Sequence, residues 1–259
     1  MLTSNSIRRC LSVRAVPAVL ALLWLPLLAG AQQLTVSAAA SLTDAFKDIG
    51  ARFEATKPGV TLRFNFAASG VLIQQISQGA PVDVLASADQ ETMQRGVDQK
   101  YIDADTRRDF AANTLVLIVP ARDGPPVATV TDLAGPAVRR IAIGKPATVP
   151  VGRYTQQALE TAGLWAALQP RLVQGDSARQ VLDYVARSEV EAGFVYRTDA
   201  TLLPGKVRVV QTVQGHAAVR YPVAVVSDSR QKALARDFAA YLLGAEAQAI
   251  LARYGFGKP

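Results

Sequence analysis

The sequence predicts an α/β fold in which two lobes each contain a mostly parallel sheet flanked by helices. The first observation is that short apolar runs typical of strands alternate with segments whose apolar residues recur at helical spacing. The second is that this alternation occurs in two sets, the later one beginning at the wholly apolar run 115–119. Strands that alternate with helices favour parallel pairing in a sheet covered on both faces. Two such sets in a chain of 259 residues indicate two lobes.

The first set of elements begins at the β-rich run Leu34–Val36, after which apolar residues from Leu42 to Phe53 fall at helical spacing. Ser41 stands just ahead of this helix and is a candidate N-cap. The alternation then continues along the chain. The further elements are predicted as a strand at 60–66, a helix at 70–78, a strand at 82–86 and a helix at 90–98.

The second set starts with the apolar strand at 115–119, and the chain ends in two helical segments. Its elements are predicted as strands at 115–119, 141–143, 192–196, 207–210 and 221–226 and helices at 153–162, 179–187, 231–243 and 245–254. The apolar runs 115–119 and 221–226 are the candidates for strands that cross between the lobes. We therefore expect lobe I to comprise residues 32–113 and 222–259, and lobe II residues 114–221.

Residues 1–31 have the pattern of a cleaved export signal. Three arginines and no acidic residue precede the apolar run Ala15–Leu28, and the small residues Ala29 and Ala31 predict cleavage after Ala31. The apolar run is short for a membrane-spanning helix and two prolines interrupt it, which disfavours a retained anchor. We therefore expect a periplasmic protein. Adjacent arginines Arg8 and Arg9 leave the twin-arginine route open beside the general one.

Composition excludes several classes of function. The single cysteine, Cys10, falls within the predicted signal, so the mature chain has no thiol for a disulfide, a metal or catalysis. The formal charge of +7 drops to +4 once the three arginines of the signal are removed, and no basic run with interleaved aromatics follows. Nucleic acid is therefore not an expected partner. The only histidine, His216, lies in a turn-like stretch, and nucleophile-elbow, dinucleotide and P-loop motifs are absent from the sequence.

Small or hydroxyl residues mark the starts of four predicted helices. They are Ser41, Ser69-Gly70, the stretch Val149–Gly152 and the stretch Asp176–Ala178. A helix start exposes unpaired backbone N–H groups at the positive end of the helix dipole. Strand-to-helix turns lie at the carboxyl edge of an open α/β sheet, where ligands bind. Four converging helix starts would therefore form a receptor for an anion.

Seven phrases spread over essentially the whole mature chain are specific enough to compare with known families. They are AAASLTDA at 38–45, GAPVDV at 79–84, SADQ at 87–90, VPVGRY at 149–154, GFVY at 193–196, YPVAVV at 221–226 and RYGF at 253–256. In this order they closely resemble the periplasmic molybdate-binding proteins of molybdate ABC importers. The resemblance implies a type II periplasmic binding protein with its ligand in the cleft between the lobes. It also implies a monomeric protein that binds molybdate or tungstate and delivers it to the membrane subunits of an ABC permease. Such a protein is not an enzyme. No cofactor is implied, because the oxyanion is the transported ligand.

The resemblance also implies which residues hold the oxyanion. Matched position by position, they are Ser41, Ser69, Val151, Ala178 and Tyr196. The serines would donate hydroxyl and backbone N–H, Val151 and Ala178 only backbone N–H, and Tyr196 its phenol. The family often has alanine in place of Val151 and valine in place of Ala178, a difference that leaves a main-chain donor intact. Molybdenum would be held as molybdate, with no direct metal-ion ligand.

None of the matched residues is cationic, so fixed dipoles would have to stabilise the anion. We expect Arg153 and Arg179 to be solvated side chains of first helical turns rather than direct ligands. Phosphate carries a proton near neutral pH and needs an acceptor in its site, which none of the five matched residues offers. Phosphate stays an alternative ligand only because Asp176, a possible acceptor, lies near them in the sequence. Sulfate also stays an alternative, because it differs from molybdate in size alone. Two further alternatives are a secreted hydrolase that uses Ser41 or Ser69 as nucleophile, and a regulator's sensing domain. The hydrolase lacks a well-placed base, and the regulator lacks a DNA-binding helix-turn-helix.

Overall fold

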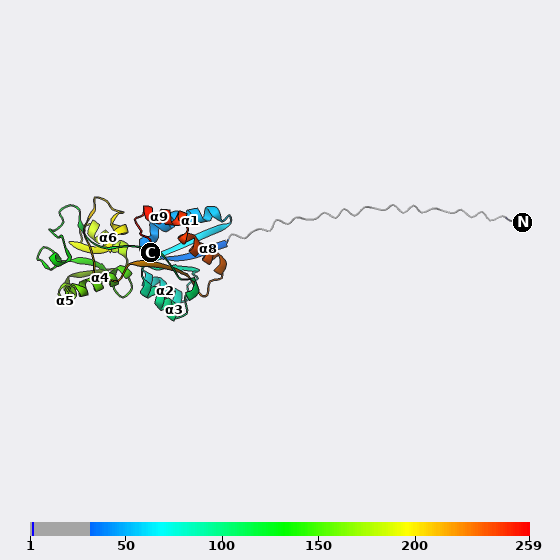
Figure 1. Cartoon of the computed structure of the whole chain (residues 1–259), viewed down its shortest axis with the longest axis horizontal. Coiled ribbons are helices and arrows are strands. Elements are labelled where there is room, and N and C mark those ends of the chain that lie inside the picture. The colour runs from blue at the N-terminus through cyan, green and yellow to red at the C-terminus, as the bar shows by residue number, and fades with distance from the viewer. Residues whose placement is uncertain (1, 3–31) are drawn as a thin grey trace. The chain divides into compact units, whose positions relative to one another are not determined.

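The computed structural model describes Leu2 and residues 32–259 (Figure 1). The predicted signal peptide and its cleavage after Ala31 lie outside that continuous part of the chain. Within residues 32–259, no helix combines the length and the apolarity that crossing a membrane requires.

The first sheet contains five strands in the order β2-β1-β3-β10-β4. Strand β1 pairs in parallel with β2 and β3, whereas β10 pairs antiparallel with both β3 and β4. One strand of the five therefore runs against the others. The strands are β1 (Gln32–Ala39), β2 (Val60–Ala67), β3 (Val84–Ala86), β4 (Arg108–Ala112) and β10 (Arg220–Val225).

The second sheet repeats this plan in the order β7-β6-β8-β5-β9. Strand β6 pairs in parallel with β7 and β8, and β5 pairs antiparallel with β8 and β9. In each sheet the antiparallel strand is the one that enters directly from the other sheet. The strands are β5 (Leu115–Pro120), β6 (Ile141–Gly144), β7 (Leu172–Gly175), β8 (Ala192–Tyr196) and β9 (Val207–Thr212).

Helices cover both faces of each sheet (Figure 1). Around the first sheet lie α1 (Thr43–Thr56), α2 (Ser69–Ser77), α3 (Gln90–Asp98), α8 (Lys232–Leu243) and α9 (Ala245–Arg253). Around the second lie α4 (Pro150–Thr161), α5 (Trp165–Leu168), α6 (Ala178–Ala186) and α7 (Arg197–Ala200). Single 3-10 turns are η1 (Ala40–Leu42), η2 (Ala104–Thr106), η3 (Val130–Ala134) and η4 (Gln169–Arg171).

The predicted α/β class with two mostly parallel sheets is confirmed, with differences in detail. The sequence analysis missed β4 and β7, short strands at opposite ends of the two sheets. The apolar runs predicted to cross between the lobes form β5 and β10, but each pairs within one sheet. The crossings fall instead in the segments 113–114 and 213–219. A continuous apolar run indicates that a strand is buried on both faces. It does not indicate where the chain passes from one sheet to the other.

The division into lobes at 113/114 and 221/222 stays a proposal, and we use lobe I and lobe II for those ranges. Strand β10 begins at Arg220, slightly before the second boundary. Aromatic side chains pack the interior of lobe I, where Phe238 meets Phe46 and Phe53 with ring centroids 6.2 and 5.2 Å apart. All three rings are buried, so they hold α1 against α8.

A pair of glycines brings the start of α4 against the second sheet. A Cβ on Gly152 would lie 2.0 Å from the carbonyl oxygen of Gly144, the last residue of β6. Backbone atoms cannot move aside as a flexible side chain does, so only glycine permits this approach. The contact places the first turn of α4 at the carboxyl edge of the second sheet.

Candidate functional site

A small cavity lies where the carboxyl ends of strands from both sheets meet. The space there that protein atoms do not occupy is about 210 Å³, part of which is open to solvent. All five residues that the resemblance assigned to the ligand, Ser41, Ser69, Val151, Ala178 and Tyr196, line this cavity. The remaining lining residues are Ala39, Ala40, Ala67, Ala68, Ala88, Val149 and Pro150. The wall is therefore built of small side chains, which let backbone groups approach the centre.

Ser41 lies in the 3-10 turn η1 that joins β1 to α1. Its predicted role as N-cap of α1 is wrong, because the N-cap of that helix is Leu42 and makes no side-chain cap. The Ser41 hydroxyl instead lies 2.9 Å from the hydroxyl of Tyr221, in a buried hydrogen bond. Because Asn113 Nδ2 donates to Tyr221 Oη at 3.2 Å, the phenol O–H can donate its hydrogen bond to Ser41 Oγ. The Ser41 proton can then point elsewhere.

Ser69 is the first residue of α2 and is fully buried. Its Oγ accepts a hydrogen bond of 3.0 Å from the backbone N–H of Ala88, which also lines the cavity. An oxygen that accepts from a backbone donor keeps its own proton available. The first-turn N–H of Ser69 has no intrahelical acceptor either. Ser69 can therefore present two donors to one ligand.

Val151 and Ala178 contribute main-chain groups from two more helix starts. Val151 follows Pro150 in the first turn of α4, and Ala178 is the first residue of α6. First-turn N–H groups have no intrahelical partner and lie at the positive end of the dipole. Ser177 Oγ caps α6 by accepting from the N–H of Gln180 at 3.1 Å, which leaves the Ala178 N–H free of that cap. Both residues are buried at the cavity wall.

Tyr196 ends β8 and carries the cavity's one ionisable side chain. Its hydroxyl is buried, and no group in residues 32–259 forms a hydrogen bond with it. Burial raises the pKa of the Tyr196 phenol well above its usual value, so the group stays protonated and can donate. Buried polar groups are almost always paired, and an unpaired hydroxyl at a cavity indicates a partner that binds there.

The electrostatics of the cavity favour an anion without a counter-ion. No arginine, lysine, aspartate or glutamate lines it, and the hydroxyl and N–H groups present are neutral donors. Transfer of a bare ion into a low-dielectric site costs tens of kcal/mol in the Born limit, so a dianion needs several donors at once. Helix starts and hydroxyls from both lobes supply them.

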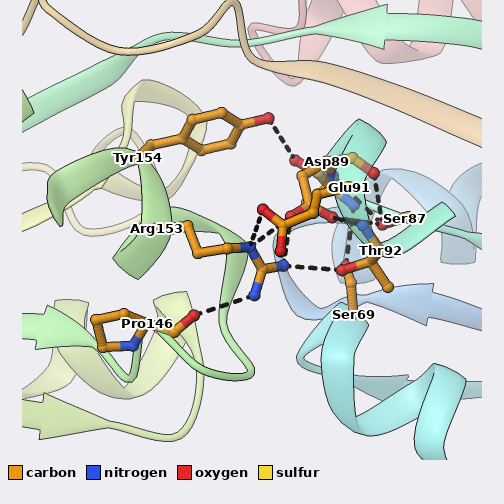
Figure 2. A network of polar contacts seen from close by, with 9 residues as sticks. Ser69, Ser87, Asp89, Glu91, Thr92, Pro146, Arg153 and Tyr154 are labelled. Atoms are coloured by element: carbon orange, nitrogen blue, oxygen red, sulfur yellow. Dashed lines mark hydrogen bonds and ion pairs between the residues drawn. The ribbon is translucent and has the colours of Figure 1, made fainter. Parts of the chain in front are cut away.

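The expectation that Arg153 is solvated is wrong. Figure 2 shows its guanidinium reaching from α4 to lobe I, where Nε donates to Asp89 Oδ2 at 2.8 Å and Nη2 bonds the same oxygen and Thr92 Oγ1. Only 12% of the Arg153 side chain is exposed. The acid that pairs with it lies in the other lobe, 64 residues away, which explains why local sequence did not reveal the pair.

Arg179 likewise lies outside the cavity wall and is paired rather than solvated. It bonds Asp44 of lobe I at 2.7 Å and forms an ion pair with Asp199 of lobe II. Asp176 is exposed and does not line the cavity, so it offers no acceptor to a protonated ligand. Direct backbone contact between the lobes is made by Gly70, whose N–H donates to the carbonyl oxygen of Thr148 at 2.9 Å.

Sequence reasoning also missed Tyr221 and Ala88 as supports of the two serines. Tyr221 was visible only as part of a predicted strand and of the phrase YPVAVV, and Ala88 only as part of a phrase before a helix. Neither position carried a local signal for its role, because each acts on a serine distant in sequence, 180 residues away for Tyr221 and 19 for Ala88.

The arrangement does not resemble a hydrolytic or metal site. The partners of the two serines are a backbone N–H and the phenol of Tyr221, whose pKa burial raises well above its usual value, so neither takes a serine proton at neutral pH. His216 lies between β9 and β10, where its Nε2 is 3.1 Å from the carbonyl oxygen of Val213. Within the described residues, no cluster of three histidine, cysteine or acidic side chains could hold a metal ion.

Comparisons with known proteins show relatives that match most of the chain. Residues 34–257 match the family described as bacterial extracellular solute-binding protein. The chain is 40% identical to the molybdate-binding protein ModA of Escherichia coli, over 88% of this chain and 90% of that protein. It is 36% identical to the putative ABC transporter substrate-binding lipoprotein YvgL of Bacillus subtilis, over 86% and 85%. Among solved structures, the periplasmic molybdate-binding protein of Azotobacter vinelandii superposes with a TM-score of 0.76 at 25% identity, covering 87% of this chain and 99% of that one.

Proposed function

This chain belongs to the bacterial extracellular solute-binding protein family, and on that premise we propose that it is the molybdate-binding component of a molybdate ABC importer. It is a binding protein and not an enzyme. It works in the periplasm after removal of residues 1–31, binds molybdate or tungstate as a monomer, and hands the oxyanion to the membrane subunits of the permease. No cofactor takes part, because the oxyanion itself is the cargo.

One observation carries this proposal: donors from both lobes converge on one small cavity that contains neither a cation nor a carboxylate. Ser41 and Ser69 donate from lobe I, and Val151, Ala178 and Tyr196 donate from lobe II. A tetrahedral dianion has acceptor lone pairs in every direction and no proton to give. The neutral donors therefore match it without an opposing acceptor.

Contributions from both lobes couple binding to closure. A ligand stabilises a conformation in proportion to its differential affinity for it, and only the closed arrangement brings all five donors to one point. The ligand-bound protein therefore has a closed conformation that differs from the ligand-free one, and the permease can recognise this difference. The unpaired hydroxyl of Tyr196 would gain its partner at the same step.

Selectivity follows from the rigidity of the donors. Helix starts and buried hydroxyls fix the distance from the centre of the cavity to each donor, so a smaller dianion such as sulfate cannot reach all of them. Each buried donor left unpaired costs about 1–3 kcal/mol. Two unmade bonds would weaken binding about 30-fold or more. Phosphate is further disfavoured because the cavity has no carboxylate to accept its proton.

The test is a thermal-unfolding and calorimetric titration of the purified chain from Gln32 onward with molybdate, tungstate, sulfate and phosphate. We expect molybdate and tungstate to raise the Tm clearly, as tight ligands of the native state do, and sulfate and phosphate to have little effect. If sulfate stabilises the protein as much as molybdate does, the protein is still an oxyanion carrier, but molybdate is the wrong ligand. No response to any oxyanion would refute the proposal.

A further inference from the structure

One guanidinium connects the two lobes beside the cavity. Arg179 Nη2 donates to Asp44 Oδ2 at 2.7 Å, and Arg179 Nε lies 2.8 Å from Asp199 Oδ1 in an ion pair that lacks hydrogen-bond alignment. Asp44 lies on α1 in lobe I, whereas Asp199 lies on α7 in lobe II. Arg179 thus stands between a carboxylate of its own lobe and one of the other lobe.

The two carboxylates differ in burial. Asp199 is fully buried, and Arg179 is the cation that forms an ion pair with it, so the Arg179 charge compensates that of the carboxylate. The Asp44 side chain is 37% exposed, and that of Arg179 is 29% exposed. A buried ion pair is strongly held once formed, because separation would leave an uncompensated charge in the interior. Arg179 is therefore anchored on lobe II by Asp199, and its remaining donors face lobe I.

Each member of this trio adjoins a residue that lines the cavity. Arg179 directly follows Ala178 in α6, Asp44 lies three residues beyond Ser41, and Asp199 lies three residues beyond Tyr196, the N-cap of α7. Because so little backbone separates the residues of each pair, a contact that holds the charged residue also restrains its neighbour at the cavity. The trio therefore joins the three segments that carry Ser41, Ala178 and Tyr196.

We infer that Arg179 is a positioning residue for ligand binding: held by Asp199 on lobe II, it closes onto Asp44 of lobe I and keeps the donors on the three segments in place around the anion. The inference rests on the proposed oxyanion binding. Arg179 does not touch the ligand, since it is absent from the cavity wall and its charge is engaged by two carboxylates. The contact with Asp44 forms only when the lobes meet, so it slows the release of the ligand.

The test is the Asp44→Asn variant, which removes the lobe I half of the clamp and leaves the Arg179–Asp199 pair intact. We expect its Kd for molybdate, measured by calorimetry, to rise about 1.5- to 5-fold, the range for a partly exposed charge pair. Most of the change should be in the dissociation rate, measured by displacement with excess tungstate. Raising the ionic strength should weaken wild-type binding more than binding by the variant, because salt screens the pair.

The matched control is Asp48→Asn, which removes the same charge from the next turn of α1. Asp48 lies 3.7 Å from Arg253 and accepts from Tyr254 Oη at 2.8 Å, contacts that stay within lobe I. This variant should bind molybdate as the wild type does, and Asp44→Glu should restore most of the affinity. If Asp44→Asn behaves like Asp48→Asn while the wild type binds molybdate, the clamp is refuted and the proposed function stands. If the wild type binds no oxyanion, the proposed function fails and the clamp with it.

Discussion

Removing the Tyr196 hydroxyl should weaken ligand binding without weakening the fold. In the Tyr196→Phe variant the ring stays in place, at 5.9 Å between centroids from that of Tyr221, and only the buried, unpaired oxygen is lost. If that hydroxyl donates to a dianion, the variant loses a hydrogen bond to a charged group, about 1.5–3 kcal/mol. The Kd for molybdate should then rise about 10- to 150-fold.

The same change should affect the free protein in the opposite direction. A buried hydroxyl with no partner carries a desolvation cost of about 1–3 kcal/mol, which phenylalanine does not. The unfolding free energy without ligand should therefore stay the same or increase. At molybdate concentrations well above both Kd values, the stabilisation by ligand should fall by the lost binding energy, which corresponds to a Tm gain roughly 3–12 °C smaller than that of the wild type.

Calorimetry with molybdate and urea unfolding with and without it measure both effects. The control is Tyr241→Phe, which removes a hydroxyl bonded to Glu246 at 2.8 Å on the surface of lobe I and should leave the Kd unchanged. Wild-type affinity in Tyr196→Phe would remove this phenol from the site. A joint fall in affinity and in the stability of the free protein would show that the hydroxyl has a structural role instead.

Three more predictions concern single residues. Ser69→Ala removes a donor hydroxyl and the acceptor of the Ala88 N–H. The loss of a hydrogen bond to a charged ligand, about 1.5–3 kcal/mol, should appear in calorimetry as a 10-fold or greater rise in the molybdate Kd. A smaller change would exclude this hydroxyl as a ligand group. Gly152→Ala forces a Cβ against the carbonyl of Gly144, so urea unfolding should show a loss of about 1–3 kcal/mol, and unchanged stability would contradict the close approach. Burial raises the pKa of Asp199 from 3.8 to about 6, despite the Arg179 charge, so the folded state takes up a proton at a higher pH than the unfolded chain. As pH falls from about 6 to about 4, the unfolding free energy of the wild type should therefore rise relative to that of Asp199→Asn, and parallel curves would contradict the shift.

Periodicity was sufficient to predict most elements because burial is a local property of a segment. The apolar run 115–119 became β5, and the spacing of apolar residues from Leu42 to Phe53 became α1. Two of the four edge strands, β4 and β7, were missed because they are short and only partly buried; β7, for example, has one buried residue, Gly175. The period of such a segment is too weak to predict a strand.

The helix starts around the cavity were also accessible from the sequence, because a helix start exposes backbone N–H groups whatever its side chains. Val151 and Ala178 themselves were named through the resemblance, and they line the cavity although the family often has other residues there. The unpaired state of the Tyr196 hydroxyl was not accessible, because it depends on every neighbour of that oxygen.

The amino-acid sequence was enough to predict the class of fold, the four helix starts and, through the resemblance, the five residues that line one cavity. The pairings that support these residues became visible only in the folded protein. The hydrogen bonds Ser41–Tyr221, Arg153–Asp89 and Arg179–Asp44 join residues that are 180, 64 and 135 positions apart in the sequence. Periodicity and capping act within a few residues of the chain, whereas these contacts exist only after two separately formed sheets come together and bring distant side chains within hydrogen-bonding distance.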